Sequence, residues 1–143
     1  MVATDAYSII QEPPSVATYR HLRTAAGLSD RLPEAAARGL AGGLFAVQII
    51  HEGAPVAMAR VVGDGGSTFQ VVDVAVLPAH QGKGLGKRLM AEVMRYIDAH
   101  VPDSAYVSLI ADGEAQRLYA QYGFVLTAPA SVGMALKRPR LGG

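Results

Sequence analysis

The chain has 143 residues, a length typical of one domain, and 50% of them are hydrophobic, which is enough to form a core. It contains no cysteine, which excludes disulfides, zinc–thiolate sites, iron–sulfur clusters and cysteine nucleophiles. Thirteen basic and 12 acidic residues leave a net charge of +1, which is too even for a dedicated nucleic-acid-binding protein.

The N-terminal part of the chain predicts one short strand followed by two helices. Tyr7–Ile10 has strand character and is followed by two prolines. Ser15 is a typical helix N-cap, and apolar residues at helical spacing follow it as far as Gly27. A second, alanine-rich helix is predicted from Pro33 to the glycine-containing residues 39–43.

The middle of the chain predicts three strands and a helix. Residues 44–50 and 56–62 are mostly apolar and flank a glycine-containing turn, which indicates an antiparallel hairpin. A third strand is expected over residues 68–76. From Leu85 to Ile97, apolar residues recur every four positions, which predicts an amphipathic helix.

The C-terminal part predicts a strand at residues 106–110 and a short helix that Asp112 can cap and Gly123 can end. Two closing strands are expected at residues 124–126 and 132–136. The order of elements, β-α-α-β-β-β-α-β-α-β-β, indicates a single mixed α/β domain.

The most informative segment joins the third strand of the middle region to the amphipathic helix. Glycines at positions 82, 84 and 86 allow a ligand to approach the main chain closely. The N-terminus of the helix supplies free N–H groups and the positive end of a dipole. Three basic residues lie in the same segment: Lys83, Lys87 and Arg88. The segment therefore predicts a phosphate or pyrophosphate site, and the alternative is a tight turn that binds nothing.

The spacing of the glycines excludes two common phosphate-binding motifs. A P-loop requires Ser or Thr after Gly86-Lys87, where Arg88 stands, and Gly in place of Gln81. A dinucleotide-binding fingerprint would require glycine at position 87 or 89, and neither residue is glycine.

Gln81-x-x-Gly84-x-Gly86 instead resembles the Q/R-x-x-G-x-G/A motif of the acetyl-CoA-dependent GNAT superfamily of N-acetyltransferases. The strand Asp73–Pro78 resembles the central strand of that family. Asp112–Phe124 is similar to its N-x-x-A-x-x-L-Y-x-x-x-G-F segment. The resemblance covers nearly the whole chain. It implies one α/β domain, residues 1–143, with a twisted, mostly antiparallel sheet of six to seven strands and about four helices.

The resemblance also implies where the substrates bind. Acetyl-CoA is expected as co-substrate on the strand, turn and helix of residues 69–100, and the helical pair at about residues 12–42 is expected on the acceptor side. No metal is expected, since the four histidines show no ligand spacing. The cofactor-binding residues that the resemblance implies are Ala75, Val76, Gln81, Gly82, Lys83, Gly84, Leu85, Gly86, Lys87, Asp112 and Tyr119.

Direct attack of an amine on the thioester makes three chemical demands. The tetrahedral oxyanion needs fixed N–H donors, a role the resemblance gives to the backbone of Ala75 and Val76. The leaving thiolate benefits from a proton donor, and Tyr119 matches the tyrosine that serves the family as this acid. The amine itself, with a pKa of ~10.4, must lose a proton before it attacks. The alternative for Tyr119 is a purely structural place in the core.

Asp73 is the predicted base or amine anchor. Alternation along the strand predicts that its side chain lies on the same side as Phe69, Val71 and Ala75, two residues from the acetyl-binding backbone. The alternative is a structural aspartate that caps a loop or pairs with an arginine. Asp112 replaces the family's usual asparagine, and an ionised carboxylate can only accept hydrogen bonds. This exchange is expected to weaken one contact with pantetheine.

The acceptor is expected to be the primary amine of a small molecule. The alternatives are a protein N-terminus or lysine as acceptor, or a non-catalytic module that senses acyl-CoA. No apolar run reaches the ~18 residues of a membrane span, and the first residues do not resemble a secretory signal. Together with the missing cysteines, this predicts a cytoplasmic monomer or homodimer with no nucleic-acid or membrane partner.

Overall fold

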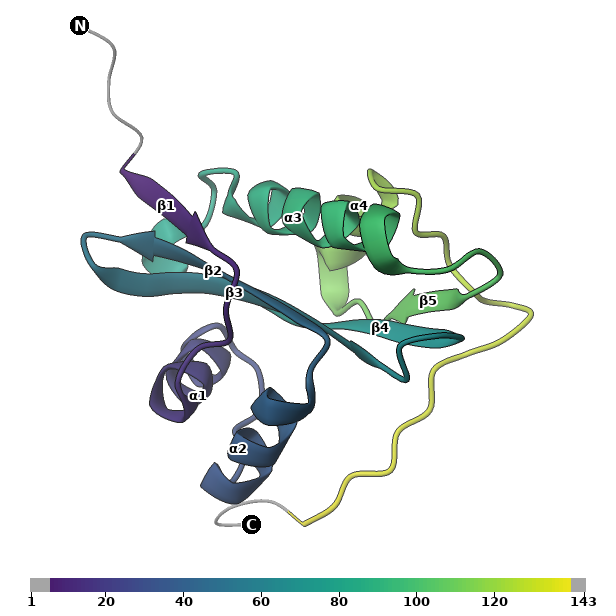
Figure 1. Ribbon diagram of the computed structural model, residues 1–143, viewed down its shortest axis with the longest axis horizontal. Coiled ribbons are helices and arrows are strands. Elements are labelled where there is room, and N and C mark those ends of the chain that lie inside the picture. Colours follow the sequence, from purple (N-terminus) through teal and green to yellow (C-terminus); the bar gives the residue numbers. More distant parts are fainter. Residues whose placement is uncertain (1–5, 140–143) are drawn as a thin grey trace, which may run out of the picture.

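The computed structural model describes residues 6–139, and a five-stranded sheet with helices on both faces forms its centre (Figure 1). The strands lie in the order β1-β2-β3-β4-β5. The pairs β1–β2, β2–β3 and β3–β4 are antiparallel, and β5 runs parallel to β4. They span β1 (Tyr7–Ile10), β2 (Phe45–His51), β3 (Ala54–Gly63), β4 (Thr68–Val76) and β5 (Tyr106–Leu109). The predicted mixed α/β class is confirmed.

Four α-helices cover the two faces of this sheet, as predicted (Figure 1). Two 3₁₀ turns, Pro78–His80 and Gly113–Ala115, precede α3 and α4. The helices are α1 (Val16–Ala25), α2 (Pro33–Gly42), α3 (Leu85–His100) and α4 (Gln116–Ala120). In the part of the chain that the structure describes, no helix is long and apolar enough to cross a membrane.

Each face of the sheet has its own core. The larger core lies under α3 and includes Val47, Phe69 and Leu89, which are almost completely buried. The smaller core lies under α1 and α2, where Leu22 packs against Met58. Residues that alternate along β3 therefore point into different cores, as period-two strand geometry requires.

Ser15 and Pro33 begin α1 and α2 as the sequence predicts. The Ser15 hydroxyl accepts a hydrogen bond from the Thr18 amide at 3.1 Å, which satisfies one free amide at the start of α1. Pro33 occupies the first turn of α2, where its missing N–H has no cost. Asp112, in contrast, does not cap a helix with its side chain, so that part of the prediction is wrong.

The two predicted closing strands, at residues 124–126 and 132–136, are not formed, so the sheet has five strands rather than six or seven. Their apolar residues face solvent; Val125, Met134 and Leu136 are 85–91% exposed. Apolar alternation indicates which residues could share a strand face. It does not ensure pairing, and among residues 6–139 this segment is not bonded to any strand.

Candidate functional site

The turn between β4 and α3 depends on glycine at two positions. Gly82 and Gly84 have φ of +76° and +79°, a region that side-chain-bearing residues avoid. A Cβ built on either residue would meet no atom within 4 Å, so the main chain here borders open space. Gly84 is the N-cap of α3 and provides no side chain to its free amides.

These free amides form a row at the start of α3. The first intrahelical bond runs from the Arg88 amide to the Gly84 carbonyl at 3.2 Å, so the N–H groups of residues 85–87 precede it. Lys83 and Lys87 are exposed beside the row, and the first turn has no acidic residue. The Leu85 side chain is buried in the core and anchors the helix end. This combination of amides, dipole and cations suits an anion.

Gly86 has a different role from Gly82 and Gly84. A Cβ at this position would lie 3.1 Å from the Leu118 Cδ2 atom, so Gly86 allows the start of α3 to pack closely against α4. The Tyr122 hydroxyl donates to the Lys87 carbonyl at 3.0 Å and holds the same two segments together. The glycine that the sequence assigned to ligand approach therefore also serves packing.

Strands β4 and β5 separate beside this turn. Their pairing ends at Val71 and Leu109, whereas β4 continues to Val76. The Leu77 amide donates to the Val56 carbonyl at 2.9 Å. By the alternation of an antiparallel ladder, the peptide groups of Val76 then point away from β3, into the opening between the separated strands.

In the β3–β4 ladder, the peptide groups of Ala75 and Val76 point in opposite directions. Ala75 lies opposite Met58, in the register that directs its N–H and C=O toward β3, so its backbone is not free as the resemblance implied. The Val76 carbonyl accepts a hydrogen bond from the Gln81 side-chain amide at 3.1 Å. Gln81 thus ties the glycine-rich turn to the end of β4, and the Val76 N–H remains directed into the opening.

Tyr119 lies on α4 with its side chain in the larger core, and only 8% of the residue is exposed. Burial raises the pKa of the Tyr119 phenol above its ordinary value, and the negative charge of the nearby Asp112 raises this pKa further. The phenol is therefore protonated at neutral pH and can donate a proton. Asp112 is exposed at the start of the 3₁₀ turn before α4.

Asp73 lies at a β-bulge in β4. Residues 72 and 75 pair with Arg60 and Met58, so β4 has one extra residue here, and Asp73 has a φ of +56°. The bulge places the carboxylate on the α1–α2 face, whereas Phe69 and Val71 belong to the core under α3. The prediction that Asp73 shares a side with those two residues is wrong, because simple alternation fails at a bulge.

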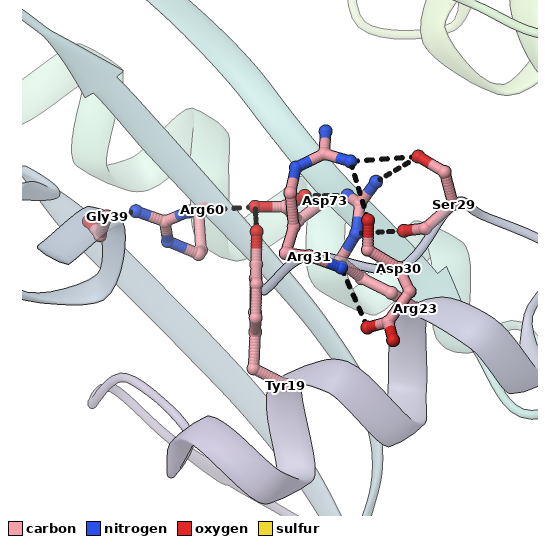
Figure 2. A network of polar contacts seen from close by, with 8 residues as sticks. All are labelled: Tyr19, Arg23, Ser29, Asp30, Arg31, Gly39, Arg60 and Asp73. Carbon is pink, nitrogen blue, oxygen red and sulfur yellow. Dashed lines mark hydrogen bonds and ion pairs between the residues drawn. The ribbon is translucent and has the colours of Figure 1, made fainter. Parts of the chain in front are cut away.

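The Asp73 carboxylate is 6% exposed and is held by three side chains, drawn in Figure 2. Arg60 Nη1 lies 2.8 Å from Oδ2, the Tyr19 hydroxyl donates to Oδ2 at 3.1 Å, and Arg23 Nη1 is paired with Oδ1. Both carboxylate oxygens are therefore already engaged by charged or hydroxyl donors. The geometry favours the arginine-paired alternative for Asp73.

The arginines extend this network to the helices (Figure 2). Arg60 Nη2 donates to the Gly39 carbonyl in α2 at 2.7 Å, and Arg23 Nε donates to the Ser29 carbonyl at 2.8 Å. Asp73 thereby joins the sheet to α1, to α2 and to the loop between them. Sequence reasoning missed this network, although Arg60, a charged residue within an apolar strand, was a visible signal.

His51 and His80 form a cluster with Tyr7. The Tyr7 hydroxyl lies 2.8 Å from His80 Nδ1, and the ring of His51 lies 4.9 Å from each of the other two rings. This cluster packs the turn after β4 against β1 and β2. Among residues 6–139, no group of three or more metal-ligating side chains is brought together.

Comparison with known proteins identifies the family. A family model described as "Acetyltransferase (GNAT) domain" matches residues 41–126. The chain is similar to serotonin N-acetyltransferase 2, chloroplastic, of Oryza sativa, with 36% identity over 88 residues; the match covers 62% of this chain and 43% of the rice protein.

Two solved structures resemble the whole fold. A probable acetyltransferase from Staphylococcus aureus, SA2161, has 42% identity and a TM-score of 0.89 over 92% of this chain and 99% of that one. The GNAT family protein SP0256 from Streptococcus pneumoniae has 25% identity and a TM-score of 0.73 over 94% and 98%. The resemblance of the sequence motifs is thus confirmed, and the chain belongs to the GNAT family of acetyltransferases.

Proposed function

We propose that this chain binds acetyl-CoA and transfers the acetyl group to the primary amine of a small molecule. One observation carries the proposal: β4 separates from β5 next to the row of free amides at the start of α3. The opening so formed has a backbone donor at Val76, and Tyr119 lies in the core beside it. A pure binding module would require no such proton donor.

The residues present fit acetyl-CoA in charge and in hydrogen-bonding groups. The amides of residues 85–87, with Lys83 and Lys87 beside them, would hold the diphosphate. The free edge of β4 offers peptide groups to the two amides of pantetheine, as one strand offers them to another. Acetyl-CoA supplies the activated acyl group to this arrangement.

The proposed reaction is a direct attack of the neutral amine on the thioester carbonyl. The C–N bond forms, the carbonyl becomes a tetrahedral oxyanion, and the Val76 N–H donates a hydrogen bond to it. The C–S bond then breaks as the Tyr119 hydroxyl gives its proton to the departing thiolate. The amine proton passes to water, because Asp73 is already held by two guanidinium groups.

The choice of a small-molecule acceptor draws on the rice relative, whose name states that it acetylates serotonin. That protein contains the matched region in less than half of its length, so the acceptor of this chain remains part of the proposal. A location in the cytoplasm, inferred from the cysteine-free composition, belongs to the proposal as well.

A turnover assay across a panel of amines tests this function. Because the chain has no cysteine, a thiol reagent detects only released CoA and responds to nothing in the protein itself. The panel contains arylalkylamines, aliphatic amines, amino acids and lysine-containing peptides, at pH 7 to 9. We expect CoA release to be accelerated by at least one small amine. Turnover of peptides alone would establish a protein acceptor, and CoA binding without any turnover would establish a sensor.

A further inference from the structure

The ion pairs of the loop between α1 and α2, residues 26–32, leave one arginine without a carboxylate. Arg20 donates to both carboxylate oxygens of Asp30, at 2.8 Å and 3.1 Å. Arg31 has no carboxylate partner among residues 6–139, and its Nη1 donates instead to the Ser29 hydroxyl and to the Asp30 carbonyl. The positive charge of Arg31 is therefore not compensated within the described part of the chain.

The buried network beneath this loop also has more positive than negative charge (Figure 2). Arg23 and Arg60 share the single carboxylate of Asp73, and all three side chains are 6–7% exposed. Their other partners are neutral: backbone carbonyls, the Ser29 hydroxyl and an aromatic ring. Two guanidinium groups and one carboxylate leave one positive charge, and Arg31 adds a second. Because uncompensated charge near the protein interior is unfavourable, this region favours a nearby anion.

Two guanidinium groups meet at the hydroxyl of Ser29, as Figure 2 shows. Arg31 Nη1 donates to Ser29 Oγ at 2.8 Å, and Arg23 Nη2 donates to the same oxygen at 3.2 Å. These two bonds occupy both lone pairs of the oxygen, so the hydroxyl can only donate a further bond. Its O–H has no acceptor among residues 6–139, and both Ser29 and Arg31 are exposed. A hydroxyl polarised by two cations is a suitable donor to an anionic oxygen.

The loop is fixed to the strand that carries the proposed oxyanion donor. Leu28 packs against the smaller core, to which the end of β4 contributes. Arg23 Nε donates to the Ser29 carbonyl at 2.8 Å, and the same guanidinium is paired with Asp73 in β4. Asp73 precedes Val76 by only three residues. A ligand bound to Ser29 therefore lies on the side of β4 where the acceptor is expected.

We propose that the acceptor is an amine that also carries an anionic group, a carboxylate or a phosphate, and that Ser29 and Arg31 bind this group. The proposal names the substrate class of the proposed function and rests on that function. The Ser29 hydroxyl and the Arg31 guanidinium donate to the oxygens of the anion, whose charge offsets the positive excess of the region. The amine end remains free to approach the thioester. The same two groups repel acceptors with a second positive charge, such as polyamines.

Matched pairs of acceptors test the proposal, because each pair differs mainly in one negative charge. The pairs are β-alanine with β-alaninamide, tryptophan with tryptophanamide, and phosphoethanolamine with ethanolamine. The first two pairs test a carboxylate and the third a phosphate. We expect at least one anionic amine to exceed its neutral partner in kcat/KM by about tenfold or more, with each value referred to the concentration of unprotonated amine. A preference for the neutral member in every pair would overturn the proposal.

Three arginine variants then assign this preference to its residue. Arg31→Gln should bring the ratio within a pair close to one, and Arg31→Lys should retain part of it, because a lysine keeps the charge but not the planar fork. Arg38→Gln, a matched change at an exposed arginine of α2 outside the loop, should keep the full ratio. Thermal melts check that each variant is folded. A full ratio in Arg31→Gln would overturn the assignment.

Binding can be followed without turnover through the NMR signal of Arg31 Nε in protein saturated with CoA. We expect this signal to shift when β-alanine or phosphoethanolamine is added, and to stay in place with β-alaninamide and ethanolamine. A shift without turnover of any amine would refute the proposed function alone. Turnover of neutral amines without the shift would refute only this inference. A shift caused by CoA itself would also overturn it, since the loop would then bind the cofactor.

Discussion

Strand β4 carries two polar regions that use their hydrogen-bonding groups in opposite ways. Around Asp73, in the middle of the strand, every carboxylate oxygen has a donor and the side chains are buried. Past the end of the strand, the N–H groups of residues 85–87 precede the first bond of α3, the Val76 N–H points away from β3, and exposed lysines lie beside the turn. Both regions look functional in the sequence. Only the second has unused hydrogen-bonding capacity for a ligand, and the first uses its capacity to hold the fold together.

The largest effect is expected from Asp73→Ala. The substitution leaves the Arg23 and Arg60 guanidinium groups buried without their shared partner, which should lower the free energy of unfolding by about 3–5 kcal/mol. Urea denaturation measures this loss. The fraction that remains folded should bind acetyl-CoA as the original protein does. A variant with unchanged stability and no acetyl transfer would instead return Asp73 to the role of base.

Tyr119→Phe tests whether the Tyr119 hydroxyl is the proton donor beside the open end of β4. Loss of the proton donor should reduce kcat roughly ten- to a thousandfold, while acetyl-CoA affinity changes by a factor of a few. Steady-state kinetics and calorimetry separate these two quantities. Tyr96→Phe, a matched change on α3 where the ring stacks on Phe45, should keep its kcat. If Tyr119→Phe also kept its kcat, Tyr119 would be only a core residue.

A pair of glycine variants separates backbone strain from ligand binding. Gly84→Ala and Gly27→Ala both place a side chain at φ near +80° to +90° in open space, so each should lower stability by about 1–2 kcal/mol. Only Gly84→Ala should weaken CoA binding, by about tenfold or more if one charge-assisted hydrogen bond is lost. Calorimetry with CoA measures the difference. Equal affinities in the two variants would show that the turn does not contact the cofactor.

The lysines beside the amide row should have smaller effects. Lys83→Ala and Lys87→Ala are each expected to weaken CoA binding about two- to fivefold at low salt, and less at high salt, because exposed charges are screened. Titrations at two salt concentrations test this dependence. Affinity losses that do not change with salt would mean that the lysines contact CoA in a way other than through exposed charge.

The smallest effect concerns the pKa of Tyr119. Because the Asp112 carboxylate contributes to raising this pKa, Asp112→Asn should lower it and shift the alkaline limb of kcat toward lower pH. The sign follows from charge, since a negative neighbour disfavours the phenolate and a neutral one does not. A pH–rate profile of the two proteins checks the direction, and a shift toward higher pH would contradict it.

The comparison along β4 also shows what the sequence can predict. The glycine-rich turn could be predicted from the sequence because its residues act locally. A left-handed backbone favours glycine, and the free amides at a helix start require no distant partner. The Asp73 network could not, because one extra residue in β4 changes the face on which Asp73 lies, and its partners come from α1 and β3. The two closing strands at residues 124–126 and 132–136 were predicted wrongly for a related reason. Their apolar residues alternate as in a strand, yet alternation does not identify a neighbouring strand to pair with.

An NMR titration of the labelled protein with acetyl-CoA, followed at backbone amides and arginine side chains, tests most directly where the cofactor binds. We expect the amide signals of Gly86, Lys87 and Val76 to shift, while the Nε signals of Arg23 and Arg60 stay in place. The opposite result would be a shift of the arginine signals without a shift of those three amides. Acetyl-CoA would then bind at the closed network, and the open end of β4 would be only a turn.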